Sequence, residues 1–253
     1  MLDETTYYFT AFALDQNNNI IDSKTGSVTT DFGWKPDSSR TMIYLQLEND
    51  FVDRSGNTRT ITTSWLSYTT VWWVPSLHLW SSWWWILTSP YPLQSDPTKP
   101  ITISVLIYVT SAQISSRRNI IEFACTNWNR IFFCIRENTS NIELSSSQWE
   151  TVYATLHAPV IANSWMHIVV TWTTNSTKLY VNWELKESWN WNPKPRWNRP
   201  YGWDNKQAFF SRRDWDYANS LQWNARELIM EQIEWDENFI RSYYNSIKHK
   251  LWF

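Results

Sequence analysis

The sequence predicts an all-β protein: a two-sheet antiparallel sandwich in jelly-roll order with a short helix at its C-terminal end. From residue 41 onward, short segments alternate apolar and polar side chains, and turns rich in Ser, Asn, Pro and Trp separate them. Regular short strands with such turns are typical of sandwiches and jelly rolls. The one helical pattern covers 236–248, where apolar residues recur at spacings of three and four and Asp236 is placed to cap the start.

The strand patterns are clearest in the middle of the chain. Apolar side chains occupy every second position of 101–109, which places them on one face of a strand. Two hairpins are expected, formed by 120–125 with 130–136 and by 166–172 with 178–182.

The charge of the chain limits its partners. It has 22 Lys+Arg and 24 Asp+Glu, a net charge of −2, and the basic residues do not cluster. This balance argues against a nucleic acid or an anionic membrane held by bulk charge. No apolar stretch reaches the ~18 residues that cross a bilayer, so no membrane insertion is expected. The first residues lack the pattern of a signal peptide, so we expect either a cytoplasmic chain or a missing N-terminus.

Tryptophan and glycine occur in unusual numbers. The chain has 21 Trp and 4 Gly, whereas average usage of about 7% would give roughly 18 Gly. Trp also stands where turns are expected, as in Asn127-Trp128, although Asn-Gly is the strongest hairpin-turn signal. Setting aside five Trp that look genuine leaves 16, which together with the 4 Gly makes 20. These five are Trp34, Trp149, Trp165, Trp172 and Trp235.

We therefore hypothesise that a codon meaning Gly in the source has been read as Trp at most of these positions. The hypothesis predicts that Trp165 and Trp172 are packed inside the protein. It also predicts exposed turns or loops at Trp83, Trp84, Trp85, Trp128 and Trp183. The alternative is an aromatic-rich carbohydrate binder with Trp platforms on its surface, which would not explain the missing Gly.

Residues 1–33 form a separate pattern. The segment TYYFTAFALDQNNNIIDSKTGSVTT predicts a hairpin with a Tyr-rich first arm and an Asn-rich turn. It resembles the last two strands of a fibronectin type III domain. Because two strands do not bury a core by themselves, we interpret 1–33 as the tail of a truncated upstream module. The linker is then 34–40, and the main domain is 41–253.

The most informative stretch is 164–185, SWMHIVVTWTTNSTKLYVNWEL. It resembles the signature hairpin of laminin-G-like, concanavalin A-like lectin/glucanase domains: Trp-x-His-Val-Val-x-Thr, a polar turn, then Leu-Tyr-Val-Asn-Gly. Trp183 stands in the place of the final Gly, as the glycine hypothesis predicts. Residues 45–57 and 221–240 resemble the opening and closing strands of the same family, with Trp223 in another Gly position. The resemblance covers 41–250 and implies the jelly-roll fold.

No catalytic arrangement stands out, so the chain is expected not to be an enzyme. Retaining glucanases on this fold carry acids as Glu-x-Asp-x-x-Glu along one strand, and no such cluster is present. Glu227, Glu231 and Glu234 have spacings of four and three amid apolar residues, which is typical of a closing strand leading into a helix. We interpret His167 as a packed or hydrogen-bonded sheet residue rather than a base.

The two cysteines flank the predicted turn at 127–128. With these two residues at its centre, Cys125 faces Arg130 and Cys134 faces Ile121. The sulfurs are then too far out of register for a disulfide, and we expect buried thiols.

A structural calcium ion is implied by the resemblance, since lectin-like domains of this type often bind one through carboxylate and carbonyl oxygens. The opening and closing strands adjoin in the family, so Asn49, Asp50 and Asp53 are expected to meet Glu227. Arg226 takes the place of a family Asp and weakens this site. Solvated turn acids are the alternative interpretation.

Two later segments offer the planar acceptors and the aromatic face that sugars use. The candidate ligand-binding residues are Asp204, Asn205, Asp214, Asp216 and Tyr217. The alternative is that both segments are ordinary polar loops.

These features together predict a non-catalytic module for glycan binding or adhesion, belonging to a larger bacterial surface or secreted protein and located outside the cell. Its partner would be a polysaccharide or the glycan of a glycoprotein. The alternatives are an accessory carbohydrate-binding domain of a glycoside hydrolase whose catalytic domain lies upstream, and a structural spacer. Neither the ligand's identity nor an oligomeric state follows from the sequence.

Overall fold

The fold comes from a computed structural model. It describes residues 5–30, 35–57, 59–64, 67–71, 73–78, 85–89, 99–111, 118–126, 129–136, 141–148, 151–190, 207–209 and 224–248. Its contacts divide the chain into two units, Met1–Lys35 and Pro36–Phe253, each described by itself below. The assignment of 1–33, 34–40 and 41–253 to a truncated module, a linker and a main domain stays a prediction.

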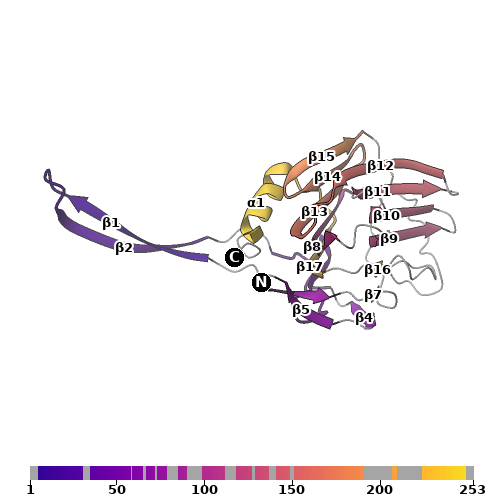
Figure 1. The fold of residues 1–253 in the computed structure, drawn as a ribbon, viewed down its shortest axis with the longest axis horizontal. Coiled ribbons are helices and arrows are strands. Elements are labelled where there is room, and N and C mark those ends of the chain that lie inside the picture. Colours follow the sequence, from indigo (N-terminus) through magenta and orange to yellow (C-terminus); the bar gives the residue numbers. More distant parts are fainter. Residues whose placement is uncertain are drawn as a thin grey trace. The chain divides into compact units, whose positions relative to one another are not determined.

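The first unit is an antiparallel hairpin of β1 (Thr5–Leu14) and β2 (Ile20–Thr30), as expected from its alternation (Figure 1). The Asp15 carboxylate accepts hydrogen bonds from two backbone N–H groups of the turn, at 2.7 and 2.9 Å. The ring of Phe9 lies across Gly26, where a Cβ atom would come within 2.7 Å of it. The resemblance to a fibronectin module stays a prediction. Large apolar side chains are exposed at Phe9, Phe12, Leu14, Ile20 and Ile21.

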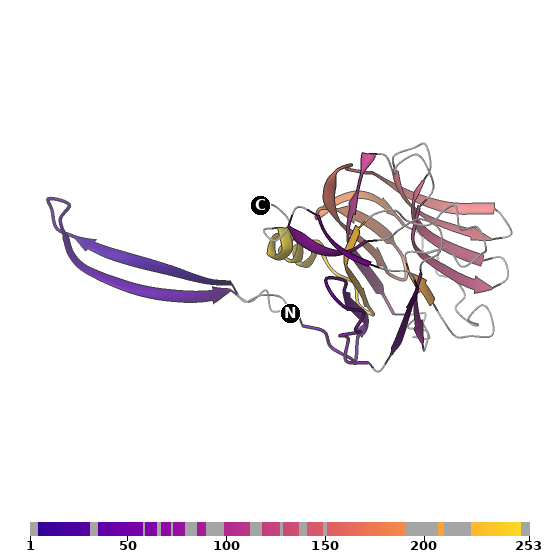
Figure 2. The ribbon, with the colours of Figure 1, turned by 60° about the horizontal axis from the view of Figure 1, so that its bottom comes forward.

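The second unit contains two packed sheets (Figures 1 and 2). The seven-stranded sheet has the order β12 (Thr151–Pro159), β11 (Asn141–Gln148), β10 (Asn129–Arg136), β9 (Arg118–Thr126), β16 (Gln207–Phe209), β7 (Trp85–Ser89), β4 (Thr60–Ser64). The eight-stranded sheet has the order β15 (Glu184–Trp189), β14 (Thr177–Val181), β13 (Ser164–Trp172), β8 (Ile101–Val109), β17 (Asn224–Glu231), β6 (Val74–His78), β5 (Ser67–Val71). β3 (Thr41–Gln46) also pairs with β17. Pairings between the described strands are antiparallel, which confirms the predicted sandwich.

The core lies between the two sheets and comes from alternating positions of their strands. The alternation predicted for 101–109 is confirmed, because its apolar face belongs to the core. Each fully buried aliphatic side chain contributes about 1.5–3 kcal/mol to folding. Core residues of the two central strands are Ile101, Ile103, Val105, Ile107 and Val109 of β8, and Met166, Ile168, Val170 and Trp172 of β13.

The opposite face of the eight-stranded sheet is covered by α1 (Glu237–Lys248), which Figure 2 shows beside the sandwich. Asp236 Oδ1 accepts a hydrogen bond from the backbone N–H of Phe239 at 2.7 Å, which confirms the predicted helix cap. The helix buries Ile240, Tyr243 and Ile247. β8 is therefore buried along its whole length on both faces.

Two register shifts change the expected pairing of β9 and β10. Cys134 was expected opposite Ile121 but pairs with Asn119, because the register shifts between Phe133 and Cys134. Cys125 lies at the other shift, where Thr126 pairs with Asn129 and Ala124 with Arg130. Cys134 is a buried thiol, as expected.

The tryptophan predictions have mixed outcomes. Trp165 and Trp172 are each 4% exposed, which confirms that they are packed inside. Trp183 lies in the β14–β15 turn as predicted, but it is half-buried because the Arg241 guanidinium lies 4.4 Å over its ring. The prediction for Trp85 is wrong, because this residue begins β7 and pairs with β4. Trp83, Trp84 and Trp128 lie outside the described residues.

Candidate functional site

The ligand-binding residues that the sequence predicts lie outside the described residues, and their role stays a prediction. They are Asp204, Asn205, Asp214, Asp216 and Tyr217.

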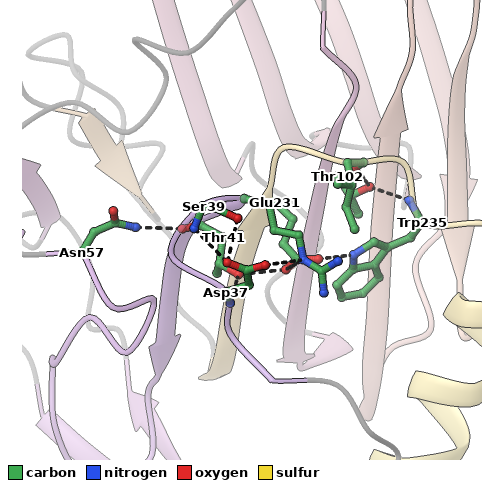
Figure 3. A network of polar contacts seen from close by, with 9 residues as sticks. Asp37, Ser39, Thr41, Asn57, Thr102, Glu231 and Trp235 are labelled. Atoms are coloured by element: carbon green, nitrogen blue, oxygen red, sulfur yellow. Dashed lines mark hydrogen bonds and ion pairs between the residues drawn. The ribbon is translucent and has the colours of Figure 1, made fainter.

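Glu231 of β17 is a buried acid, with 0% of its surface exposed. Its Oε1 accepts a hydrogen bond from Thr41 Oγ1 at 2.8 Å, and its Oε2 accepts one from Trp235 Nε1 at 2.6 Å (Figure 3). The Arg40 Nε lies 3.7 Å from Oε1. This carboxylate therefore joins the opening strand β3 to the segment that follows β17.

Glu227 lies four residues earlier on the same face and has its own fixed donor. The hydroxyl of Tyr243 on α1 donates to Glu227 Oε1 at 2.5 Å. Burial and the neighbouring Glu227 carboxylate raise the pKa of Tyr243 well above its ordinary value, so the phenol stays protonated and keeps donating. Both acids therefore hold the sheet to its neighbours, as expected for a closing strand. Their closure from solvent argues against a role in hydrolysis.

His167 is a buried titratable group that at first sight suggests catalysis. Its Nε2 lies 2.8 Å from Ser104 Oγ, and its ring packs against Tyr243 and Tyr244 of α1. Burial lowers the pKa of His167 to about 3, so the imidazole is neutral at physiological pH. Ser104 and His167 are each 1% exposed. The geometry therefore confirms the interpretation of His167 as a packed, hydrogen-bonded sheet residue.

The described residues of the predicted calcium site face different partners. Asp50 binds Arg54 through two hydrogen bonds, of 2.7 and 2.6 Å. Asp53 Oδ1 accepts hydrogen bonds from backbone N–H groups of Tyr44 and Ser55. Asn49 is exposed, and Glu227 is held by Tyr243 as described. No three metal-binding side chains converge within the described part of the chain.

Arg226 explains part of this arrangement. It lies at a register shift of β17, and its Nε and Nη2 donate to Glu48 Oε1 at 3.1 and 2.9 Å. A guanidinium thus supplies positive charge where the opening and closing strands meet. The four residues therefore have separate partners in this arrangement, and calcium binding stays a prediction.

A second group of side chains in this region reaches the surface and was not predicted. The rings of Phe51 and Tyr68 lie 5.3 Å apart between centroids at an angle of 36°, and Tyr68 is 36% exposed. Phe51 comes from the loop after β3 and also packs against the core, which fixes its position. Tyr68 comes from the edge strand β5. We call Asp50, Phe51, Arg54 and Tyr68 the edge patch.

The charges of the edge patch are fixed by its own contacts. Hydrogen bonds from Arg54 lower the pKa of Asp50, and the same contact raises the pKa of Arg54, so both are charged. Burial, and then the Asp50 carboxylate, raise the pKa of Tyr68, so its hydroxyl stays protonated. The patch combines an aromatic face, a hydroxyl, a carboxylate and a guanidinium. These groups match the C–H faces and hydroxyls of a sugar.

Sequence reasoning missed the edge patch because its members come from two separate segments. Asp50 was considered only as a metal ligand, and Tyr68 was not singled out. No local sequence pattern distinguishes Tyr68, because three consecutive residues of its short strand are exposed.

In the described part of the chain, no helix has the length and apolar character needed to span a bilayer.

Comparisons with known proteins agree with this architecture. A model of the concanavalin A-like lectin/glucanases superfamily matches residues 86–224. The chain is similar to the ligand binding domain of botulinum neurotoxin serotype D in complex with N-acetylneuraminic acid, with a TM-score of 0.61 and 20% identity over 82% of this chain and 51% of that one. A search of curated proteins found no match.

Two further structures show the same likeness. The receptor binding domain of botulinum neurotoxin D has a TM-score of 0.61 and 21% identity, over 82% of this chain and 53% of that one. A structure of botulinum neurotoxin type C, whose cell entry depends on interaction with two ganglioside molecules, has a TM-score of 0.62 and 14% identity, over 83% and 52%. The chain spans about half the length of these proteins, and at such identities the likeness concerns the fold.

Proposed function

Because the chain belongs to the concanavalin A-like lectin/glucanases superfamily, we propose that its second unit is a non-catalytic glycan-binding or adhesion module. In this proposal it acts outside the cell, as part of a larger bacterial surface or secreted protein. Support comes from the fold that it shares with toxin domains that bind N-acetylneuraminic acid and gangliosides. Those ligands are bound by proteins of whose length this chain covers only about half, so the likeness supports a class of ligand rather than one sugar.

The edge patch is the observation that carries the proposal. The Phe51 ring is anchored in the core, the Tyr68 ring lies against it and is partly exposed, and the Asp50–Arg54 pair lies beside them. A sugar placed here would rest on the Tyr68 ring and exchange hydrogen bonds with the charged pair. Aromatic and charged side chains fixed by their own contacts lose little freedom on binding, which favours affinity.

The absence of catalysis in this proposal rests on the described acids. Glu227 and Glu231 are closed from solvent and already accept hydrogen bonds from Tyr243, Thr41 and Trp235. A general acid and a nucleophile must both reach the glycosidic bond. We expect the chain not to hydrolyse polysaccharides.

Two alternative functions are an accessory domain of a glycoside hydrolase and a structural spacer. An accessory domain of a glycoside hydrolase would bind sugar through the same patch, and the gene upstream distinguishes it, since a catalytic domain would be encoded there. A structural spacer would bind no glycan, and the exposed ring of Tyr68 beside an ion pair favours a binding role over it.

A glycan array tests the proposal with the full chain and two single variants. Tyr68→Ala removes the aromatic face, whereas Leu185→Ala removes an exposed apolar side chain from β15 at the other edge of the same sheet. We expect the chain to bind a defined set of glycans, Tyr68→Ala to weaken binding at least about tenfold, and Leu185→Ala to leave it unchanged.

Two results would contradict parts of the proposal. A chain that binds no glycan would be a spacer. Binding that survives Tyr68→Ala but is lost in Tyr217→Ala would move the site to the segments predicted from the sequence.

A further inference from the structure

The tight hairpins of the second unit share an unexpected residue. Among the described strands, four antiparallel neighbours are joined by two residues, as their pairing shows: Val71 with Val74, Thr126 with Asn129, Gln148 with Thr151, and Val181 with Glu184. The residues between them are Trp72-Trp73, Asn127-Trp128, Trp149-Glu150 and Asn182-Trp183. Every one of these four loops therefore contains Trp.

Two-residue hairpin loops are where glycine is most needed. They adopt type I′ turns, with positive φ at both residues, or type II′ turns, with positive φ at the first. Asn-Gly and Gly-Gly are favoured in the former, and Gly-X in the latter. Replacing the Trp by Gly turns the four loops into Gly-Gly, Asn-Gly, Gly-Glu and Asn-Gly, which are the favoured sequences.

The described loop residues have the backbone that this argument requires. Trp73 has φ of 66° and Trp183 has φ of 70°, following Asn182 at 50°. The other described residues with positive φ are Asn18, Asn163, Asn182 and Gly56, types that tolerate this conformation. The two tryptophans are the exceptions, because a bulky side chain strains the left-handed region. Trp73 is also 85% exposed.

Three other tryptophans behave as genuine ones. Trp165 and Trp172 are buried, and Trp235 is buried with its Nε1 donating to Glu231. None of the three has positive φ. Among the described tryptophans, three therefore lie in the interior and two, Trp73 and Trp183, lie in tight loops, while Trp85 and Trp189 lie in the strands β7 and β15.

We propose that the native protein carries glycine at 72, 73, 128, 149 and 183, and that its source reads as glycine a codon rendered here as tryptophan. Because Gln148 pairs with Thr151, we move Trp149 from the genuine set to the glycine set, which leaves 17 candidate Trp. If all of them were glycine, the total of glycine would be 21, near the roughly 18 expected for this length. It follows that Trp73 is no sugar platform. The edge patch contains no Trp and is unaffected.

Trp183 is the most demanding of the five positions. Arg241 lies over its ring, and glycine would lose that contact, although Arg241 keeps its bond to Glu237. The backbone strain that glycine relieves at this positive φ must therefore exceed the stabilisation lost with the cation–π contact. At Trp73 no such contact opposes the change in the described structure.

The coding sequence gives the first test. Because genuine and replaced tryptophans occur in one chain, two codons must be involved. We expect UGG at 165, 172 and 235, and a different codon at 72, 73, 128, 149 and 183. The same codon in both sets would overturn the proposal.

The mass of the native protein gives the second test. Tryptic peptide 179–186, prepared from the source cells, should have the mass for Gly at position 183. The mass for Trp would refute the proposal whatever the codon.

A stability measurement gives the third. We compare the chain that has Trp at every one of these positions with a variant that has Gly at all five loop positions. A control variant has Gly at 165, 172 and 235. The loop variant should raise Tm by on the order of 2–4 °C for each relieved position, and the control should unfold or aggregate. An unchanged or lower Tm of the loop variant would count against the proposal. If neither the Trp-containing chain nor the loop variant unfolds cooperatively, the codons and the peptide mass decide whether the proposal holds.

Discussion

The two faces of the central strands β8 and β13 are both closed to solvent, but different interactions stabilise them. The inner face of β8 and β13 is apolar, with residues such as Val105 and Ile168 in the core. The outer face, beneath α1, holds Ser104, His167 and two glutamates. An apolar face needs only side chains of the right size, whereas each buried polar group needs a particular partner. The outer face therefore depends on pairs such as Thr41 and Glu231, which lie 190 residues apart in the sequence.

The inner face should show the largest response to a single truncation. Ile168→Ala removes a fully buried side chain and leaves a cavity, so it should lower the free energy of unfolding by about 2–5 kcal/mol. Because the site is apolar, the loss should be equal at pH 7 and pH 5, as measured by urea unfolding. Leu185→Ala, at an exposed position, should change stability by less than about 0.5 kcal/mol. A pH-dependent loss for Ile168→Ala would remove the distinction between the faces.

On the outer face, removal of one hydroxyl group should lower the free energy of unfolding almost as much. Tyr243→Phe keeps the ring but removes a hydroxyl donor to the buried Glu227 carboxylate, so it should lower the free energy of unfolding by about 1.5–3 kcal/mol. Tyr244→Phe, on the half-buried neighbouring ring, is the control and should cost much less. Equal costs in the two variants would mean that the Tyr243 hydroxyl contributes nothing to the outer face.

Acid should weaken the outer face through His167. Burial lowers its pKa to about 3, whereas the unfolded chain has an ordinary value near 6.5. Between these values the unfolded chain binds a proton that the folded chain does not, so stability falls as the pH falls below about 6.5. Between pH 7 and pH 5 we expect a loss of about 2 kcal/mol from this group.

Two variants isolate this effect from the titration of other groups. His167→Gln should flatten the dependence of unfolding free energy on pH, whereas Leu185→Ala, at an exposed apolar position, should not. An unchanged slope in His167→Gln would assign the acid sensitivity elsewhere.

The smallest effect is expected where charge is already balanced. Arg54 and Arg226 pair with Asp50 and Glu48 in the loop after β3 and at β17. Removing calcium with EDTA should therefore leave Tm unchanged. A Tm that rises with added calcium would instead support the predicted calcium ion.

The contrast between the faces also explains what the sequence predicts. The alternation of 101–109 and the spacing of 236–248 are local patterns, and both give the correct elements and the correct apolar face. Asp236 is equally local, since it caps a helix that starts at the next residue. Local patterns were sufficient to predict elements whose position depends only on the burial of apolar side chains.

Features that depend on partners far along the chain were not predicted. The register shift that moves Cys134 from Ile121 to Asn119 has no local signal. Glu227 was assigned to calcium because no residue near it in the sequence indicates its contact with Tyr243. The edge patch depends in the same way on the contact between Phe51 and Tyr68. The tight loops are the reverse case, because the pairing of Gln148 with Thr151 leaves two residues between β11 and β12, a spacing that the sequence alone did not reveal.

The pairing of β3 with β17 has a consequence for how the chain is made. Residues 41–46 meet their partners in β17 only when 227–231 have left the ribosome, so this pairing forms after nearly all the other strands have been synthesised. Contacts of such high sequence separation slow folding, because a long loop must close before they form. During this interval the apolar residues of β3 are exposed, and nascent chains are vulnerable to aggregation. A circular permutant that places β3 directly after α1 would shorten the wait, and it should refold faster than the natural order at similar stability.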